Sequence, residues 1–333
     1  MTARGVLEDG AVVVPDPAEA NRLHAKGWVG TPLPGNALRV PLVEAVYAVE
    51  QGRLEVSGPD GPLSLEDLLA GGAPGEALEV QVLAYRDLRE RGLVVRPDGA
   101  GGHLVWARGR GPRDAPWFRQ VAMAERDPVR IERLLAWLPE EPVLSVVDEE
   151  GAVTHYRLTA EAPLGEALPP PLPSAKGVVL QDRVLVPDAE AARVYHEAAH
   201  MGTPYGKRLV LSFTEAEWLR TQGVLDVPAD LPQRARARQH HFRRTWPVYA
   251  ALRAAGVVPR SGFRFGTHLR GYRGDPGAGH AEWLFHCVAA DDVLHWSELS
   301  RAVRLAHGVR KRFCLAVPDG GAVRYLHLAW FRP

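Results

Sequence analysis

Apolar and polar positions along the chain form one pattern that occurs twice. In each half a short apolar strand, at residues 11–14 or 183–186, precedes an amphipathic helix that starts directly after Pro-Asp. A second helix is predicted over residues 44–50 in the first half and 214–221 in the second half. Each half therefore opens with a small, partly helical unit.

The pattern then changes from helical spacing to the alternation that is typical of strands. A third helix is expected to end at Gly92 or Gly256, because glycine suits the left-handed cap of a helix. Strands are predicted over 263–272, 282–289, 313–317 and 322–329 in the second half, and over 143–147 and 152–158 in the first. The turn Pro318-Asp319-Gly320-Gly321 joins the last two strands into a hairpin. The fold class is α+β, with a mixed sheet in each half.

Identical or similar residues recur in the same order in both halves. Val13-Val14-Pro15-Asp16 returns as Leu185-Val186-Pro187-Asp188, and Gly30-Thr31-Pro32 returns as Gly202-Thr203-Pro204. Near the ends, Val146-Val147-Asp148 matches Val317-Pro318-Asp319. Ordered matches along the whole length indicate a tandem duplication.

A proline-rich segment separates the two repeats and is expected to be stiff and extended. The predicted organisation is a first repeat at 1–161 (about 1–78 and 79–161), a linker at 162–176, and a second repeat at 177–333 (about 177–238 and 239–333).

Charge is divided unequally between the repeats. The 333 residues contain 40 Lys and Arg and 40 Asp and Glu, which gives a net charge of zero. Residues 1–176 carry 18 basic and 26 acidic side chains, a net −8, whereas residues 177–333 carry 22 and 14, a net +8. Such asymmetry suggests that the second repeat binds a polyanion. The two cysteines match no zinc spacing, and no apolar run is long enough to cross a membrane, so we expect a cytoplasmic protein.

The second repeat holds three side chains that can act as an acid, a base or a cation in catalysis, and the first repeat has no counterparts of them. Tyr272 follows Gly266-Thr267-His268, His280 follows a glycine-rich segment, and Lys311 closes Val309-Arg310-Lys311. A base, an acid and a cation of these kinds can together cleave RNA without a metal. The motif set is Phe265-Gly266-x-His268-x-x-x-Tyr272, His280-x-Glu282, Val309-Arg310-Lys311 and the closing Trp330-Phe331-Arg332-Pro333.

These motifs resemble the C-terminal catalytic domain of the archaeal tRNA-splicing endonucleases, over residues 249 to 333. The duplication resembles the fused two-unit members, which work as homodimers with one catalytic and one degenerate unit. The resemblance implies a nuclease-like sheet subdomain in each repeat and a precursor tRNA substrate folded as a bulge-helix-bulge. It implies no cofactor, no metal and no membrane, and products with 2′,3′-cyclic phosphate and 5′-hydroxyl ends.

The same resemblance assigns roles to particular residues. It implies Tyr272 as general base, His280 as general acid and Lys311 as the cation that stabilises the transition state. Arg304 and Arg324 would clamp a bulged base between two guanidinium planes. Arg304 lies two helical turns before Lys311, so the two residues are expected on roughly the same face of a helix. The acidic residues Asp148, Glu149 and Glu150 would dock into a basic cleft across the assembly.

Several alternatives stay open. Ordinary pKa values, near ~10 for tyrosine and ~6.5 for histidine, would exchange the base and the acid. The basic stretch Arg234–Arg244 is either a solvated helix face, a track for phosphates or a receptor for an acidic loop. A noncatalytic RNA-binding scaffold is the main alternative function. The remote one is a zinc protease, because His196, Glu197 and His200 fit His-Glu-x-x-His. The first repeat has His24 at the equivalent place, so the duplication explains one of these histidines without zinc.

Overall fold

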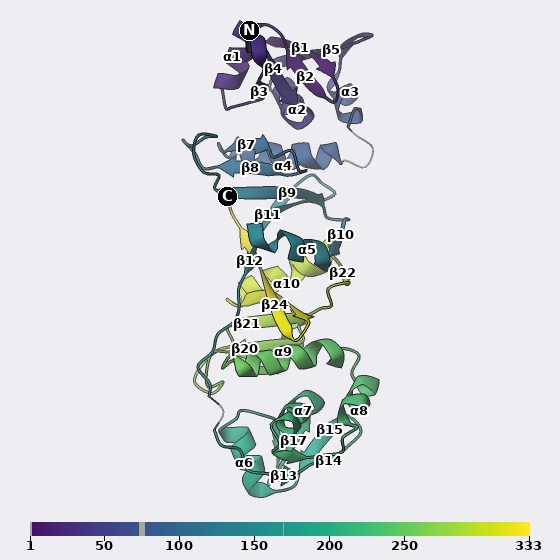
Figure 1. Ribbon diagram of the computed structural model, residues 1–333, viewed down its shortest axis with the longest axis vertical. Coiled ribbons are helices and arrows are strands. Elements are labelled where there is room, and N and C mark those ends of the chain that lie inside the picture. The colour runs from purple at the N-terminus through teal and green to yellow at the C-terminus, as the bar shows by residue number, and fades with distance from the viewer. Residues whose placement is uncertain (1, 73–76, 169) are drawn as a thin grey trace.

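The computed structural model describes residues 2–72, 77–168 and 170–333, so Met1, residues 73–76 and Pro169 of the linker lie outside the described residues. The molecule is long and narrow, with its parts stacked along one axis (Figure 1). The N-terminal subdomains of the two repeats form the two ends, and the two sheet-bearing subdomains lie between them. The C-terminus therefore lies near the middle of the molecule.

The N-terminal subdomain of the first repeat packs three helices on a six-stranded sheet in the order β3-β4-β2-β1-β5-β6. Its elements are β1 (Ala3–Glu8), β2 (Ala11–Val14), α1 (Pro17–Ala25), β3 (Thr31–Pro32), η1 (Pro34–Asn36), β4 (Leu38–Pro41), α2 (Leu42–Glu50), β5 (Leu54–Gly58), β6 (Gly61–Leu63) and α3 (Leu65–Ala70).

The sheet subdomain of the first repeat begins with α4 (Leu78–Glu90), and its strands follow. They are β7 (Val94–Pro97), β8 (His103–Trp106), β9 (Phe118–Ala124), β10 (Pro128–Arg130), β11 (Val143–Val147) and β12 (Val153–Ala160). Between β10 and β11 lie α5 (Ile131–Trp137) and the short helix η2 (Leu138–Glu140).

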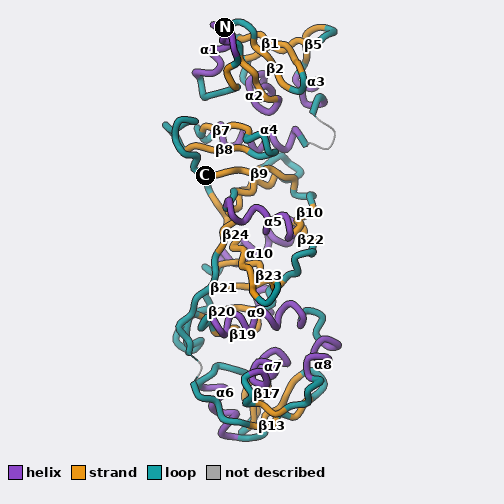
Figure 2. Tube along the Cα trace, in the orientation of Figure 1, coloured by secondary structure: helices purple, strands orange, loops and turns teal. Residues whose placement is uncertain are grey.

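The second repeat presents a closely related series of elements. Its N-terminal subdomain has β13 (Ala175–Lys176), β14 (Val178–Val179), β15 (Arg183–Val186), α6 (Ala189–Glu197), β16 (Thr203–Tyr205), β17 (Arg208–Ser212), α7 (Phe213–Thr221), β18 (Leu225–Asp226) and α8 (Leu231–Arg238). Its sheet subdomain has α9 (Phe242–Ala254), β19 (Val258–Ser261), η3 (Phe263–Phe265), β20 (Leu269–Tyr272), β21 (Trp283–Cys287), β22 (Val293–His295), α10 (Trp296–Gly308), β23 (Arg312–Asp319) and β24 (Ala322–Phe331). The tube view shows the same alternation of helices and strands in both halves (Figure 2). The α+β fold class is confirmed.

Local sequence signals explain where the helices start and stop. The Asp16 side chain accepts hydrogen bonds from backbone N–H groups at the start of α1, and Asp188 does the same for α6. Gly92 and Gly256 follow the ends of α4 and α9 with φ of 80° and 73°, in the left-handed region that glycine tolerates. These start and stop predictions are confirmed.

The two sheet subdomains share one ten-stranded sheet, in the order β19-β20-β21-β23-β24-β12-β11-β9-β8-β7. The last strands of the two repeats join the halves, because β12 pairs antiparallel with β24 from His155 opposite Phe331 to Ala160 opposite Leu326. β10 and β22 also pair across the repeats, with Val129 opposite Leu294. The repeats are therefore continuous in their backbone hydrogen bonding.

A single hydrophobic core fills the junction between the repeats. The Tyr156 ring of β12 stacks on the Trp296 ring of α10, with centroids 5.5 Å apart, and its hydroxyl donates to Ser300 Oγ at 2.8 Å. Leu144 and Leu158 of the first repeat lie in the same buried cluster as Leu315 of the second. Neither sheet subdomain encloses this core alone, so each stabilises the other.

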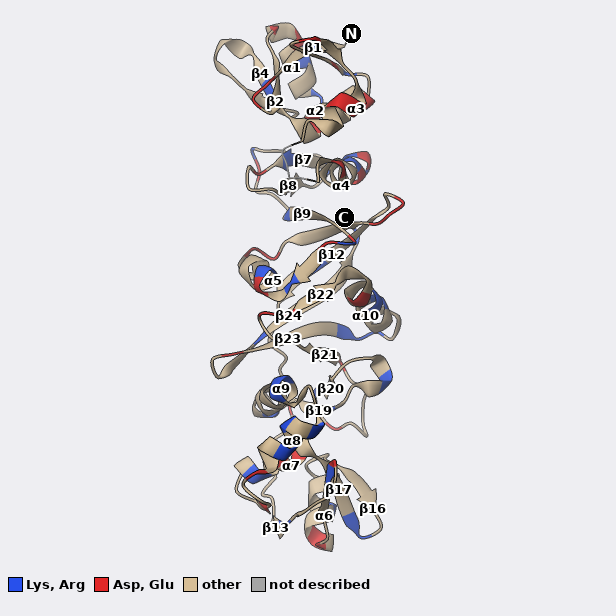
Figure 3. Ribbon diagram, turned by 90° about the vertical axis from the view of Figure 1, so that its right-hand side faces the viewer, with Lys and Arg blue, Asp and Glu red and all other residues tan. Residues whose placement is uncertain are grey.

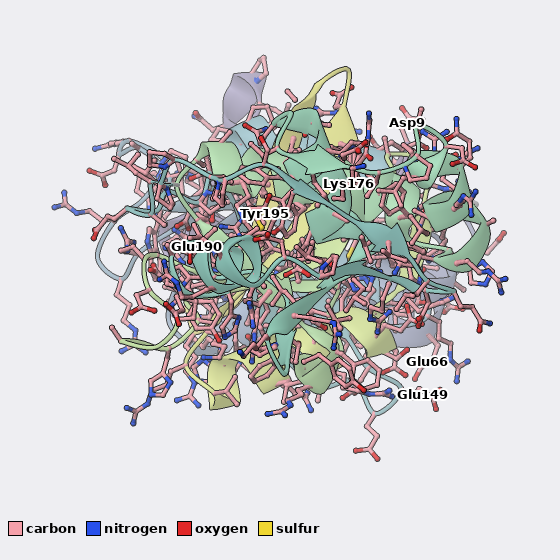
Figure 4. All side chains as sticks on the ribbon, turned by 90° about the horizontal axis from the view of Figure 1, so that it is seen from below. Asp9, Glu66, Glu149, Lys176, Glu190 and Tyr195 are labelled. Carbon is pink, nitrogen blue, oxygen red and sulfur yellow. The ribbon has the colours of Figure 1, made fainter. Side chains whose placement is uncertain are left out.

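The proline-rich linker lies along the second repeat. Gly165 N–H donates to Ala255 O, and Ala167 N–H donates to Gly256 O, just beyond the end of α9. The approach is so close that a Cβ atom on Gly165 would lie 2.1 Å from Gly256 O. Further on, the Tyr195 hydroxyl, near the centre of the view along the long axis, donates to Pro173 O at 2.7 Å (Figure 4).

One predicted strand is wrong in part. Residues 263–272 were expected to form a single strand, but Phe263–Phe265 is a short 3₁₀ helix that ends at Gly266 with φ of 65°. The strand begins only at Leu269. The turn places Phe265 close to Lys311, as described below. In the described part of the chain, no helix is long and apolar enough to cross a bilayer.

The shared core predicts that Trp296→Ala destabilises the whole central region. Trp296 is 1% exposed, so its truncation should lower the free energy of unfolding by about 3–5 kcal/mol in chemical denaturation. Tyr205→Ala, at a ring that is 66% exposed, is the control and should change this free energy by less than about 1 kcal/mol. Equal losses in both variants would contradict a shared core.

Candidate active site

Tyr272, His280 and Lys311 lie at one end of three adjacent strands. Gly271 of β20 is opposite Trp283 of β21, which is in turn opposite Arg312 of β23. Tyr272 comes one residue after the first of these positions and Lys311 one residue before the last. Because neighbouring strands are about 5 Å apart, their backbones lie within about 10 Å. The sheet thus brings together residues that are far apart in the sequence.

Lys311 lies in the turn between α10 and β23, and its ammonium group is fixed. Nζ donates to Ala281 O at 2.8 Å, next to His280, and lies 5.7 Å from the centre of the Phe265 ring. Partial burial, together with the positive charge of Arg270, lowers the pKa of Lys311. The cation is therefore held beside the segment that carries His280.

Tyr272 is the last residue of β20 and is nearly buried. Its ring packs with Val258 and Ala281 and with Ala167 of the linker. The Arg270 guanidinium lies 5.6 Å from the ring centre. The phenol is therefore rigidly placed in positively charged surroundings.

His280 is exposed, at the end of a glycine-rich segment whose ends are anchored. Arg273 and Glu282 form a two-point ion pair at 3.0 and 3.1 Å across the segment. Asp275 Oδ1 accepts from Gly277 N–H at 2.7 Å and shapes its turn. The imidazole is thus presented to solvent from a closed loop.

The strand registers identify the corresponding positions of the first repeat. Val258 is opposite Tyr272, and the matching residue Val94 is opposite Trp106. Extending the β9–β11 register places Glu140 where Lys311 stands, and Glu140 pairs with Arg119 at 3.2 Å. The first repeat thus has an indole and a carboxylate in place of the phenol and the ammonium group.

The two arginines proposed as a clamp lie on different elements. Arg304 is exposed on α10, but the helix ends at Gly308. The expectation that Arg304 and Lys311 share one helix face is therefore wrong, since Lys311 lies beyond the helix. Arg324 lies in β24 near the hairpin turn and pairs with Asp319 at 3.1 Å, at the opposite end of β23 from Lys311.

The closing motif Trp330-Phe331-Arg332-Pro333 carries an exposed aromatic and basic group beside Arg304, for which the sequence predicted no particular role. Trp330 of β24 is 42% exposed, and its ring meets the His307 ring edge-on at 5.4 Å. The Arg332 guanidinium lies 4.3 Å from the centre of the Trp330 ring. A tryptophan at an outward position of the last strand was the available signal.

Family models match individual domains of this chain, and known proteins align with nearly its whole length. The family described as "tRNA intron endonuclease, catalytic C-terminal domain" matches residues 242–325, and the one described as "tRNA intron endonuclease, N-terminal domain" matches residues 3–69 and 175–233. The chain belongs to the tRNA intron endonuclease family. The N-terminal domain therefore occurs twice, once in each repeat.

Relatives named tRNA-splicing endonuclease align over nearly all of the chain. The protein of Natronomonas pharaonis is 37% identical, with 99% of each chain covered. That of Halobacterium salinarum is 36% identical, over 94% of this chain and 95% of the relative. That of Haloferax volcanii is 34% identical, over 99% of this chain and all of the relative.

In this endonuclease chain the acidic residues Asp148, Glu149 and Glu150 form the tip of the β11–β12 hairpin. Asp148 shapes the turn, because its Oδ1 accepts from the N–H groups of Glu150 and Ala152. Glu149 pairs with Arg126, and both side chains are exposed. Seen from the side, the acidic hairpin projects from the body of the molecule (Figure 3), and along the axis Glu149 lies at its rim (Figure 4).

The basic stretch Arg234–Arg244 crosses from the N-terminal to the sheet subdomain of the second repeat, and α8 is strongly basic (Figure 3). Arg234 pairs with Asp230, and Arg244 pairs with Asp292 at 2.8 Å. A groove next to it is lined by His241, His268 and Phe263. Burial, and then the nearby imidazoles of His286 and His241, lower the pKa of His268 to about 3.

The His-Glu-x-x-His pattern does not form the helical site that a zinc protease needs. α6 ends at Glu197, and His200 lies beyond it with φ of 55°. His196 Nδ1 is engaged by Met201 O, as His24 Nδ1 is by Val29 O in the first repeat. Among the described residues, no three His, Cys, Asp or Glu side chains are grouped to hold a metal ion. The pattern is a repeated helix end.

A Ser-His-Asp relay, unforeseen from the sequence, lies inside the first repeat. Ser145 Oγ is 2.7 Å from His155 Nδ1, and His155 Nε2 is 2.8 Å from Asp87 Oδ2, while Gln120 donates to Ser145. Ser145 and His155 are 0% and 2% exposed, so no substrate reaches them. The strand registers place Ala316 and Tyr325 at the positions of Ser145 and His155 in the second repeat. The relay therefore ties α4 to the sheet.

The relay predicts an acid-sensitive stability. Burial opposes ionisation of Asp87, but hydrogen bonds from His155 and Arg91 lower its pKa to about 2. The stabilisation is then complete above the ordinary carboxyl pKa and disappears as pH falls from about 4 to about 2. Between pH 5 and pH 2, the chain should lose about 2 kcal/mol more than Asp87→Asn in denaturant titrations. The exposed Asp9→Asn is the control and should lose as much stability in acid as the parent does. Equal losses of stability in the parent and in Asp87→Asn would contradict the prediction.

Proposed function

We propose that the protein cleaves precursor tRNA at the intron boundaries in a bulge-helix-bulge, without a metal. The products carry 2′,3′-cyclic phosphate and 5′-hydroxyl ends. One observation carries the proposal: Tyr272, His280 and Lys311 lie at one sheet end in the second repeat, and Trp106 and Glu140 take the places of the tyrosine and the lysine in the first. Family membership and the full-length relatives named tRNA-splicing endonuclease support it.

The proposed reaction is an internal transfer of the phosphoryl group. Tyr272 removes the proton of the 2′-hydroxyl, and the 2′-oxygen forms a bond to phosphorus. The bond from phosphorus to the 5′-oxygen breaks, and His280 gives this leaving oxygen a proton. Lys311 offsets the extra negative charge on the phosphate oxygens in the transition state. The Arg270 guanidinium lies 5.6 Å from the centre of the Tyr272 ring, so a fixed positive charge stands beside the group that accepts the proton.

The reverse assignment, with His280 as base and Tyr272 as acid, uses the same atoms. His280 is exposed and Tyr272 is nearly buried. The fixed position of the Tyr272 ring beside Arg270 supports its role as the base, while the accessible His280 suits a leaving group that departs toward solvent.

The substrate has two cleavage points, whereas each chain has one set of these residues. A homodimer related by a two-fold axis supplies two sets. In the proposed assembly, the acidic hairpin tip of one chain docks against the basic stretch Arg234–Arg244 of the other. Arg304 and Arg324 from different chains stack on a bulged base, since a guanidinium plane suits any unpaired base.

A noncatalytic RNA-binding scaffold is the alternative in another class. The intact set Tyr272, His280 and Lys311 argues against it, because a scaffold has no need of these residues and the first repeat has Trp106 and Glu140 in the places of the tyrosine and the lysine. A scaffold would bind precursor tRNA and leave it uncut.

The chemistry predicts distinct effects of two substitutions. With intron-containing precursor tRNA in EDTA, His280→Ala should slow single-turnover cleavage by about 10²- to 10⁴-fold through loss of the acid. Lys311→Ala should slow it by about 10²- to 10³-fold through loss of the cation. Lys207→Ala, at an exposed lysine of the N-terminal subdomain, is the control and should cleave normally.

RNA binding by His280→Ala should stay within about twofold of the parent, which separates lost chemistry from lost structure. Undiminished cleavage by both variants would show that these residues are not catalytic. Absence of any cleavage by the parent, with normal binding, would favour the scaffold.

The assembly predicts that the acidic hairpin is needed for dimerisation. Glu149→Ala/Glu150→Ala, which retains Asp148 and its turn, should shift the chain toward monomer in sedimentation velocity at dilute concentration. The triple variant Asp148→Ala/Glu149→Ala/Glu150→Ala should raise the proportion of monomer further. Asp9→Ala/Glu66→Ala/Glu190→Ala removes three exposed acidic groups elsewhere and should sediment as the parent does. An unchanged distribution in the hairpin variants would refute the docking.

A further inference from the structure

The loop between β8 and β9 of the first repeat has a charge opposite to that of its repeat. It corresponds to the glycine-rich segment before His280, because β8 and β9 match β20 and β21 in order and register. It reads Arg108-Gly109-Arg110-Gly111-Pro112-Arg113-Asp114, with three basic side chains and one acidic. The loop that corresponds to the segment before His280 is thus basic, whereas the first repeat as a whole is acidic.

The loop has a defined conformation that begins at the residue in the place of Tyr272. Trp106 Nε1 donates to Asp114 O at 2.9 Å, so the substituted indole closes the loop. Asp114 Oδ2 accepts from Gly111 N–H at 3.1 Å, and Arg108 Nε donates to Arg91 O at 2.7 Å. A loop that is ordered before binding loses little conformational entropy when it binds.

The loop also rests on the N-terminal subdomain through Trp28. A Cβ atom on Gly111 would lie 2.7 Å from Trp28 Nε1, so only glycine permits this contact. The Arg113 guanidinium lies 5.6 Å from the centre of the Trp28 ring. Trp28 has φ of 62° and occupies the place of His200 in the second repeat. The loop is thus supported by both subdomains of its repeat.

The basic groups of the loop are available to a partner. Arg110 is 68% exposed in its side chain, and its ion pair with Asp114 at 3.3 Å is exposed, so that little free energy is needed to break it. Arg113 is exposed as well, and Trp117 at the end of the loop is 45% exposed. Exposed guanidinium groups beside an aromatic ring suit nucleic acid. The guanidinium groups contact the phosphates, and the ring stacks on the bases.

We propose that this loop binds the phosphate backbone of the RNA substrate, with Arg110 and Arg113 as the contacting residues. The first repeat has thereby exchanged the chemistry at this position for substrate binding. The inference rests on the proposed function, since it names a further binding site for the same RNA.

The test compares Arg110→Ala/Arg113→Ala with Arg4→Ala/Arg39→Ala, which removes two exposed arginines that lie outside the loop, in the N-terminal subdomain of the same repeat. Both pairs are made in a His280→Ala chain, so that precursor tRNA stays intact during binding, and the dissociation constant is measured from 50 to 300 mM salt. Two lost phosphate contacts should reduce the slope of log K against log salt by about 1.4–1.8 and weaken binding roughly 10-fold at 100 mM. The control pair should match its parent.

In the catalytically intact chain, Arg110→Ala/Arg113→Ala should raise KM by a similar factor and leave kcat at saturating RNA unchanged. A salt slope equal to that of the control would overturn the inference. So would a change in sedimentation without a change in RNA binding, because the loop would then contact protein. If the His280→Ala parent itself fails to bind precursor tRNA, the proposed function fails and this inference fails with it.

Discussion

The pairing of β12 with β24 is the interaction on which the rest of the structure depends. It joins two sheets of the same kind into one sheet of ten strands, and the stacked rings of Tyr156 and Trp296 close the core beneath it. Backbone hydrogen bonds and buried aromatic area act together at this junction, so the two sheet subdomains form one continuous sheet over a shared core. The three strands whose ends lie beside Tyr272, His280 and Lys311 are toward one end of the ten-stranded sheet, and their counterparts are toward the other.

Because the two duplicated sheets support each other, the residues at their outer ends can differ between the repeats without loss of the fold. In the second repeat, the sheet end holds a phenol, an imidazole and an ammonium group. In the first, Trp106 closes a basic loop, Glu140 pairs with Arg119, and a buried relay of Ser145, His155 and Asp87 stabilises the interior. The net charge of zero is therefore the sum of two specialised halves. The acidic half still carries a local basic surface, which the net charge conceals.

Local features of the fold follow from the sequence because their causes are local. Asp16 and Asp188 cap helices, and Gly92 and Gly256 end them, in agreement with simple rules. The comparison of His24 with His196 already indicated a structural role for the zinc-like pattern, and both rings bind the same carbonyl position. The hairpin formed by the last two strands of each repeat could be predicted for the same reason.

Features that depend on distant segments could not be predicted. Nothing near β12 indicates that it pairs with β24, because the contact joins residues about 170 positions apart. The relay brings together Asp87, Ser145 and His155 from three elements, and each residue alone is unremarkable in the sequence. The exact end of α10, which separates Arg304 from Lys311, and the 3₁₀ turn at Phe263–Phe265 depend on packing against neighbouring strands.

The most direct test of the central claim uses the 2′-hydroxyl that the proposed base must deprotonate. Precursor tRNA with a single 2′-deoxy nucleotide 5′ to one scissile phosphate is incubated with the protein in EDTA, and the product ends are analysed. The account predicts that the modified site stays intact while the other site is cut, with 2′,3′-cyclic phosphate and 5′-hydroxyl ends. Cleavage at the deoxy site, or products with 3′-hydroxyl and 5′-phosphate ends, would contradict it.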